Sequence, residues 1–98
     1  MKLEQALSTL RGAEVALRAK GVRHAALFGS IVRGENRPDS DVDILIDFDP
    51  AASVTMFDYV AVSNDIASLF DGPVDVVDRE ALKPHLRKPL ARDLVYAF

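Results

Sequence analysis

The sequence contains no cysteine among its 98 residues. Disulfide bonds, thiolate catalysis, iron–sulfur clusters and cysteine zinc sites are therefore excluded. No apolar run approaches the roughly 20 residues that a membrane-spanning helix requires. The N-terminal segment Met1-Lys2-Leu3-Glu4 also lacks the apolar core of a signal peptide. We therefore expect a cytoplasmic protein with no membrane partner, and any metal must be held by oxygen atoms or by its two histidines.

An excess of positive charge is also missing. Twelve Lys and Arg residues stand against 15 Asp and Glu, which gives a formal net charge of −3. Nucleic-acid-binding domains usually carry a basic stripe and a high pI, so we expect no direct binding of nucleic acid. With 49% hydrophobic and 28% charged residues, the chain has a globular composition. Its length leaves room for one domain, residues 1–98.

The acidic residues are unevenly distributed. Eleven are Asp and only four are Glu, and five of the Asp residues lie between Asp39 and Asp49. Asp is a poor former of helices and strands. Its concentration in one short stretch therefore calls for a chemical explanation.

Apolar periodicity predicts the elements of the N-terminal half. A helix begins near Leu3 and ends at Gly21, and a strand covers Val22–Phe28. After Gly29-Ser30, a short helix covers Ile31–Glu35. Polar and apolar residues then alternate strictly from Asp41 to Phe48, which predicts a second strand.

The C-terminal half continues the alternation of helices and strands. Ser53 is expected to cap a helix that runs up to Gly72-Pro73, and Val74–Val77 is a third strand. We expect the remainder, Arg79–Phe98, to be helical in two pieces, interrupted near Pro84 and Pro89, with Leu90, Leu94 and Ala97 or Phe98 as an apolar face. The apolar stripe expected on the long helix comprises Met56, Tyr59, Val60, Ser63, Ile66, Ala67 and Phe70.

Two carboxylates suit the binding of a divalent cation. Asp41 and Asp43 are two positions apart on the predicted strand, so they share one face with side-chain roots about 6–7 Å apart. Mg²⁺ prefers oxygen ligands and is usually held by one or two carboxylates together with substrate phosphates. If the strand of Asp75 pairs beside this one, it adds a third carboxylate. Such a set is used for in-line phosphoryl or nucleotidyl transfer.

A second group of residues suits the binding of phosphate. Gly29-Ser30 ends a strand and begins a short helix, where free N–H groups and a close backbone approach are available. Arg33 adds a guanidinium one turn later. The segment superficially fits a Walker A loop, but Glu35 stands where the phosphate-binding lysine belongs, so we reject a P-loop.

Together these motifs resemble a known family. The pattern Gly29-Ser30-x-x-Arg33-Gly34, followed by Ser40-Asp41-Val42-Asp43 and the later Asp75, is similar to the signature of the minimal nucleotidyltransferase (MNT) domains of the polymerase-β superfamily. The resemblance covers essentially the whole chain. It implies the α/β nucleotidyltransferase fold, a small mixed β-sheet with helices packed mainly on one face.

The resemblance also implies an activity. Members transfer a nucleotidyl group from a nucleoside triphosphate, here expected to be ATP, to a hydroxyl group with Mg²⁺; Mn²⁺ shares the same oxygen ligands. By motif, Asp41, Asp43 and Asp75 would be the catalytic metal ligands. The expected nucleotide-binding residues are Gly29, Ser30, Arg33 and Ser40.

Stand-alone MNT proteins of this size are typically antitoxins of a HEPN-domain ribonuclease toxin. In that family the antitoxin adenylylates a tyrosine near the R-x-x-x-x-H motif of the toxin. This chain has no R-x-x-x-x-H motif, so it is expected to be the antitoxin of such a pair. Two alternatives stay open: a non-catalytic module that neutralises its partner by binding, and a catalytic subunit completed by a separate substrate-binding protein.

Several other residues have a structural interpretation. Asp47 and Asp49 match no motif position, so solvation or a turn is expected for both. His24 and His85 are expected to be packed or surface residues. The basic residues near the C-terminus are expected to form a solvated face, with an interface for an acidic partner as the alternative.

Overall fold

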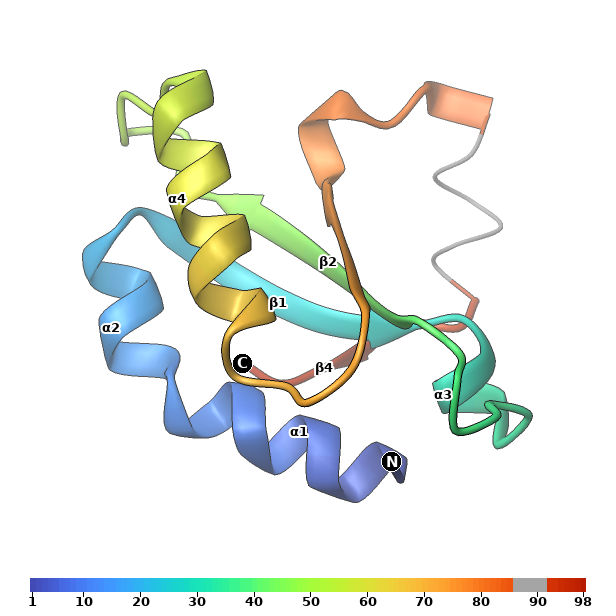
Figure 1. Cartoon of the computed structure of the whole chain (residues 1–98). Helices are drawn as coiled ribbons and strands as arrows, with labels where there is room; N and C mark the ends of the chain where they lie inside the picture. Colours follow the sequence, from blue (N-terminus) through green and yellow to red (C-terminus); the bar gives the residue numbers. More distant parts are fainter. Residues whose placement is uncertain (86–91) are drawn as a thin grey trace.

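A four-stranded mixed sheet forms the centre of the molecule (Figure 1). The structure, a computed structural model, describes residues 1–85 and 92–98. The strand order is β3-β2-β1-β4, in which β1 pairs antiparallel with β2 and β4, and β2 pairs parallel with β3. The expected small mixed sheet is thus confirmed. The strands are β1 (Val22–Phe28), β2 (Val42–Phe48), β3 (Val74–Asp78) and β4 (Val95–Tyr96).

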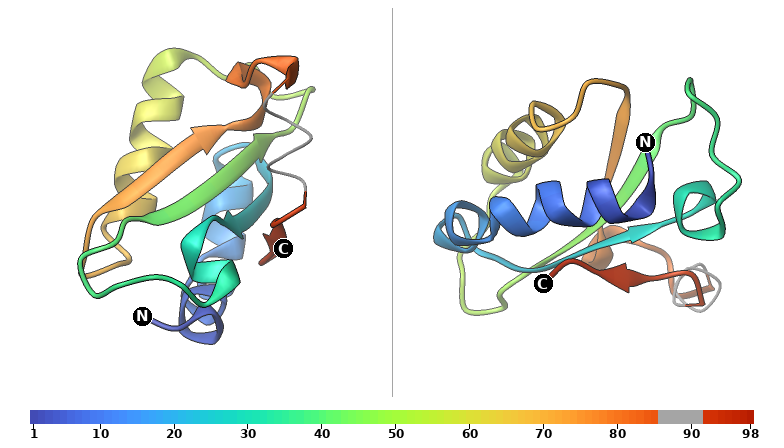
Figure 2. Two further views of the ribbon diagram at one scale, coloured as in Figure 1. Left: turned by 90° about the vertical axis from the view of Figure 1, so that its right-hand side faces the viewer. Right: turned by 90° about the horizontal axis from the view of Figure 1, so that it is seen from below.

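The longer helices pack against one face of this sheet (Figure 2). Alternation along β2 directs Ile44 and Ile46 into the core beneath α1, α2 and α4, as the sequence pattern predicted. On α4 the core contacts come from Val62 and Ile66. The helices are α1 (Leu3–Gly12), α2 (Glu14–Ala19), α3 (Ser30–Arg33), α4 (Met56–Ala67) and a 3₁₀ turn, η1 (Arg79–Ala81).

The first helix is divided, which the sequence analysis did not predict. α1 ends at Gly12, and Ala13 leaves helical geometry with φ −99° and ψ 4° before α2 begins. Glycine is unfavourable inside a helix because it loses more backbone entropy than other residues. The break lets Leu10 of α1 and Leu17 of α2 both reach the core.

The prediction for the long helix was wrong at its start and right in only part of its buried stripe, since Ile66 and Phe70 are buried as expected. The cap is Thr55, not Ser53: the Thr55 hydroxyl accepts a hydrogen bond from Asp58 N, and the Asp58 carboxylate accepts one from Thr55 N at 2.9 Å. This reciprocal capping box fixes the first turn. The helix ends at Ala67, well before Gly72-Pro73. Its buried face is set by the sheet below it, which leaves Met56 and Val60 exposed instead of buried.

The expected C-terminal helix is also wrong in its last residues. Val95 and Tyr96 form β4 on the outer edge of β1, and Ala97 N donates to Ala25 O at 2.8 Å. A β-branched and an aromatic residue favour a strand, and the pairing satisfies the free edge of β1. The predicted helical positions at Arg87, Lys88, Pro89 and Leu90 lie outside the described residues.

The described segments contain no helix both long enough and apolar enough to cross a membrane. The sheet has a second face, opposite α1, α2 and α4. Along β2 this face carries Asp43, Leu45 and Asp47 in alternation. The candidate catalytic residues therefore lie on the side away from the helices.

Candidate active site

Two strand pairings bring the predicted carboxylates together. In the antiparallel pairing of β1 with β2, Asp43 lies opposite Phe28, the residue before Gly29. In the parallel pairing of β2 with β3, Asp43 lies opposite Asp75. Adjacent strands are about 4.8 Å apart, so Asp43 stands between the Gly29 turn and Asp75. The expectation that the strand of Asp75 pairs beside that of Asp43 is confirmed.

Gly29 closely approaches the side chain of Asp43. It has φ 79° and ψ −150°, a conformation that side-chain-bearing residues rarely adopt. A Cβ atom at this position would overlap Oδ2 of Asp43 and lie 3.3 Å from its Cγ. Glycine therefore supplies both the backbone conformation and the space for the carboxylate.

Asp43 is the electrostatic centre of the carboxylate cluster. Partial burial raises its pKa above the ordinary value of 3.8, and the negative charges of Asp75 and Asp41 raise it further, while Arg33 acts in the opposite direction. Burial and like charges both disfavour the ionised form of a carboxyl group. Asp43 is thus close enough to Asp75 and Asp41 to be affected by the charge of both.

The donor chemistry of this cluster fits a hard divalent cation. All three side chains offer carboxylate oxygens, and a cation would relieve the repulsion centred on Asp43. Within residues 1–85 and 92–98, however, no three Asp, Glu or His side chains are arranged so that they could hold a metal ion together. Mg²⁺ does not require three protein ligands, because it commonly takes one or two protein carboxylates and completes its coordination with phosphates and water.

The predicted phosphate turn leads directly into α3. Gly29 is the N-cap residue, and no side chain caps the first turn of α3. Ile31, only 3% exposed, anchors this short helix in the core. Gly34 ends it in the left-handed conformation with φ 71°. Contact of Gly29 and Ser30 with phosphate stays a prediction.

Ser40 shapes the loop that precedes β2. Its hydroxyl accepts a hydrogen bond from Arg37 N at 2.9 Å, and its own N–H donates to Arg37 O at 2.9 Å. Ser40 and the exposed Asp41 line a cavity of about 200 Å³ between this loop and residues 70–73. The structure therefore gives Ser40 a role in the loop that carries Asp41, and its contact with nucleotide stays a prediction.

Arg33 already has two acidic partners. Its Nε donates to Glu35 at 3.1 Å, and its Nη1 donates to Asp93 at 2.9 Å. These carboxylates raise the pKa of the guanidinium. The pair with Asp93 joins α3 to the segment leading into β4, a contact between residues 60 positions apart that no local pattern in the sequence indicates. The predicted phosphate contact of Arg33 is not tested by this arrangement.

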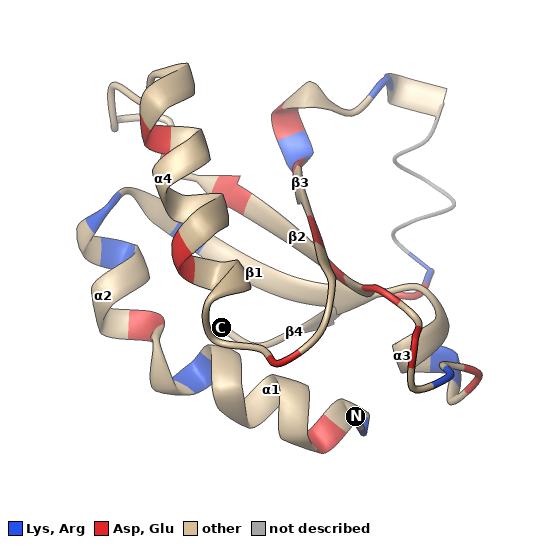
Figure 3. Cartoon of the chain, in the orientation of Figure 1, with Lys and Arg blue, Asp and Glu red and all other residues tan. Residues whose placement is uncertain are grey.

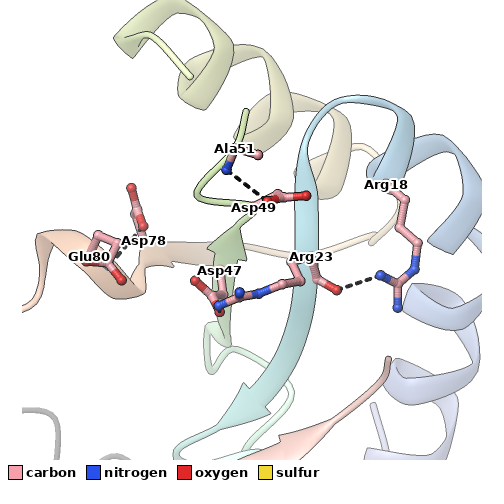
Figure 4. A network of polar contacts seen from close by, with 7 residues as sticks. All are labelled: Arg18, Arg23, Asp47, Asp49, Ala51, Asp78 and Glu80. Carbon is pink, nitrogen blue, oxygen red and sulfur yellow. Dashed lines mark hydrogen bonds and ion pairs between the residues drawn. The ribbon is translucent and has the colours of Figure 1, made fainter. Parts of the chain in front are cut away.

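Asp47 is the residue on this face that the sequence analysis misjudged. It is 4% exposed and is not solvated, because Arg23 forms an ion pair with it at 2.7 Å (Figure 4). The Arg23 carbonyl in turn accepts from Arg18 at 2.9 Å. The alternation along β2 could have indicated this environment, because it places Asp47 on the same face of the sheet as Asp43. Asp49 does form the expected turn, by accepting from Ala51 N.

Comparisons with known proteins identify relatives of this chain. The nucleotidyltransferase domain family matches residues 2–97. The protein adenylyltransferase MntA of Thermococcus cleftensis is 38% identical over 97 residues, which are 98% of this chain and 96% of that protein. A solved minimal nucleotidyltransferase superposes with a TM-score of 0.76 at 34% identity, covering 97% of this chain and 95% of that one.

A more distant structure shares the fold. It contains a tri-AMPylated HEPN toxin of Shewanella oneidensis in complex with an MNT antitoxin, and the matching chain has a TM-score of 0.60 at 19% identity. That match covers 91% of this chain and 70% of the other. The family expected from the motifs is thus confirmed: the chain belongs to the nucleotidyltransferase domain family and has the fold of a minimal nucleotidyltransferase.

Proposed function

We propose that this nucleotidyltransferase transfers AMP from ATP to a tyrosine hydroxyl of a HEPN-domain ribonuclease toxin, and so acts as its antitoxin. The observation that carries the proposal is the position of Asp43, which lies over Gly29 on one side and opposite Asp75 on the other. Carboxylates and a phosphate-binding turn are thereby adjacent, as nucleotidyl transfer requires. The full-length relative from Thermococcus cleftensis, named a protein adenylyltransferase, supports AMP as the transferred group.

The chain contributes mainly positioning to this reaction. Gly29 and Ser30 would bind the β- and γ-phosphates through the start of α3, where the backbone of Gly29 leaves room for a ligand. Asp41 and Asp43 would hold Mg²⁺, with Mn²⁺ as a substitute. When bound, the cation supplies charge neutralisation at the phosphates and activates the attacking oxygen.

The exposed carboxylate of Asp75 would lie nearest the attacking hydroxyl. The hydroxyl oxygen forms a bond to the α-phosphorus, the bond to the bridging oxygen breaks, and pyrophosphate leaves. No covalent enzyme intermediate is needed, because alignment of the two reactants supplies much of the rate enhancement. The acceptor proton passes to a neighbouring carboxylate or to water.

A mass measurement tests the proposal. The HEPN-domain protein encoded beside this chain would be incubated with it, ATP and Mg²⁺, and its intact mass recorded. We expect increases in AMP-sized steps that disappear when Asp41→Asn and Asp43→Asn are combined. A matched control combines Asp49→Asn with Glu4→Gln, which removes the same charge away from the cluster and should leave transfer intact.

The alternative is a non-catalytic antitoxin that silences its partner by binding. Transfer that persists in the variant of Asp41 and Asp43 would show that the assigned carboxylates are wrong. Complex formation without any mass increase in the wild type would instead favour neutralisation by binding alone. A neighbouring partner that lacks R-x-x-x-x-H would favour a catalytic subunit completed by a substrate-binding protein.

A further inference from the structure

β3 carries Asp75 and is held less firmly than β2, which carries Asp43. It is the last strand of the sheet, with β2 on one side and no described strand on the other. None of its residues is fully buried, whereas every residue of β2 except Asp43 is. Acidic positions of the two strands lie side by side (Figure 3), and the charge of Asp75 raises the pKa of Asp43. Like charges opposite each other on neighbouring strands are destabilising, so β3 needs a contact on its other side.

Tyr59 of α4 makes a contact on this outer edge. The N–H and C=O of one strand residue point to the same edge of the strand, and successive residues alternate. Val42 N donates to Pro73 O at 3.0 Å, so Asp75, two positions later, also turns its backbone toward β2. Val76 therefore turns its backbone outward, and its carbonyl accepts a hydrogen bond from the Tyr59 hydroxyl at 2.7 Å. No other hydrogen bond between described residues reaches the outward backbone groups of β3.

Tyr59 is itself held in place from α4. Its half-buried ring packs against the core. Its backbone N–H donates to Thr55 O at 3.0 Å, and Thr55 forms the capping box with Asp58 that fixes the first turn of the helix. A phenol ring fixed at its base can position the group that its hydroxyl binds. Here that group is the carbonyl of the residue directly after Asp75.

We propose that Tyr59 is a positioning residue for Asp75. Its hydroxyl holds β3 from the outer edge and so keeps the Asp75 carboxylate aligned beside Asp43. This inference rests on the proposed function for the role of Asp75, and it adds what keeps that carboxylate in place. A small displacement of a group that aligns the attacking hydroxyl lowers the rate of the chemical step, whereas binding of the nucleotide is unaffected.

Removal of one oxygen atom tests the proposal. Tyr59→Phe should lower kcat for AMP transfer to the HEPN-domain protein encoded beside this chain by about fivefold, which corresponds to one hydrogen bond. The KM for ATP should not change, because the proposed nucleotide ligands Gly29, Asp41 and Asp43 keep their places. Tyr96→Phe is the matched control, since it removes the same oxygen from the other tyrosine of the chain, which is 44% exposed on β4. It should transfer AMP like the wild type.

Two further measurements separate positioning from a general loss of stability. Asp75→Glu keeps the charge but moves the carboxylate by one methylene group, so its alignment should no longer depend on Tyr59. Adding Tyr59→Phe to this variant should therefore change kcat by less than about twofold. In the isolated protein, hydrogen exchange should become faster at the amides of β3 in Tyr59→Phe and stay unchanged at those of β1.

Three results would overturn the positioning role. They are a wild-type kcat in Tyr59→Phe, an equal fall in kcat when Tyr59→Phe is added to the wild type and to Asp75→Glu, and exchange that becomes equally fast in β1 and β3. AMP transfer by the wild type, scored separately by mass, decides the proposed function. If transfer occurs and exchange in β3 is unchanged, the function stands and the positioning role falls. If no transfer occurs, the function fails, and hydrogen exchange still decides whether Tyr59 holds β3.

Discussion

The carboxylate of Asp43 on β2 occupies the space that a Cβ atom of Gly29 would need, although Gly29 lies in the turn after β1 and the two residues are 14 positions apart. This contact joins the predicted phosphate turn to the acidic cluster. It depends on the positive φ of Gly29 and on the missing Cβ atom.

Gly29→Ala should abolish transfer while leaving most of the fold intact. The added methyl group would overlap Asp43 Oδ2 and would require a strained backbone at φ 79°, a strain that typically costs about 1–3 kcal/mol. Urea denaturation measures the stability and the AMP-transfer assay the activity. Gly12→Ala is the matched control, since a Cβ atom there meets nothing within 4 Å. Equal activity in both variants would contradict a role for the close approach.

Asp43→Asn should raise the melting temperature in metal-free buffer at pH 7 while eliminating activity. The pKa of Asp43 is raised above 3.8 in the folded protein. The folded protein therefore favours the neutral carboxyl group. Asp43 stabilises the fold when the pH is below the pKa that it has in the unfolded chain, and this stabilisation is lost as the pH rises through the higher pKa that it has in the folded protein. Thermal denaturation at pH 7 and pH 3 should show the gain only at pH 7. A lower melting temperature at pH 7 would refute the repulsion among these carboxylates.

Arg23→Met should destabilise the protein more than Arg23→Met combined with Asp47→Leu. The single variant leaves the buried Asp47 carboxylate without its partner, whereas the double variant replaces the pair by apolar groups. The midpoints of urea denaturation compare the two. The opposite order would mean that Asp47 is stabilised by groups other than Arg23.

Tyr59→Phe should lower the stability by about 1 kcal/mol, the usual contribution of one partly buried hydrogen bond. The Tyr59 hydroxyl donates to Val76 O and ties α4 to β3. Urea denaturation gives the free energy of unfolding. Phe57→Leu is a suitable control, because Phe57 is exposed and should change stability little. If the two variants were equally stable, the hydrogen bond would contribute nothing.

Asp93→Asn tests whether Arg33 binds the triphosphate. The substitution weakens one of the two ion pairs that hold the guanidinium. If Arg33 contacts phosphate, its release from Asp93 should lower the KM for ATP without raising kcat. An unchanged KM would assign Arg33 to joining α3 with the segment before β4.

The sequence by itself determined the family and indicated the candidate catalytic residues. Asp41 lies directly before β2 and Asp43 lies on it, and Gly29 directly precedes Ser30 at the start of α3, so the placement within each pair follows from local geometry. Strand alternation likewise predicted the inward-facing Ile44 and Ile46 correctly. Such local relations do not depend on how distant segments pack.

Only the tertiary structure decided the relations between distant residues. The register of three strands places Asp43 against both Gly29 and Asp75, and edge pairing makes Val95–Tyr96 a strand where periodicity suggested a helix. The sheet beneath α4 selects which side of an apolar helix is buried, which leaves Phe57 exposed. Periodicity is ambiguous for a helix that is apolar on more than one side, and it contains no information on ion pairs such as that of Arg23 with Asp47.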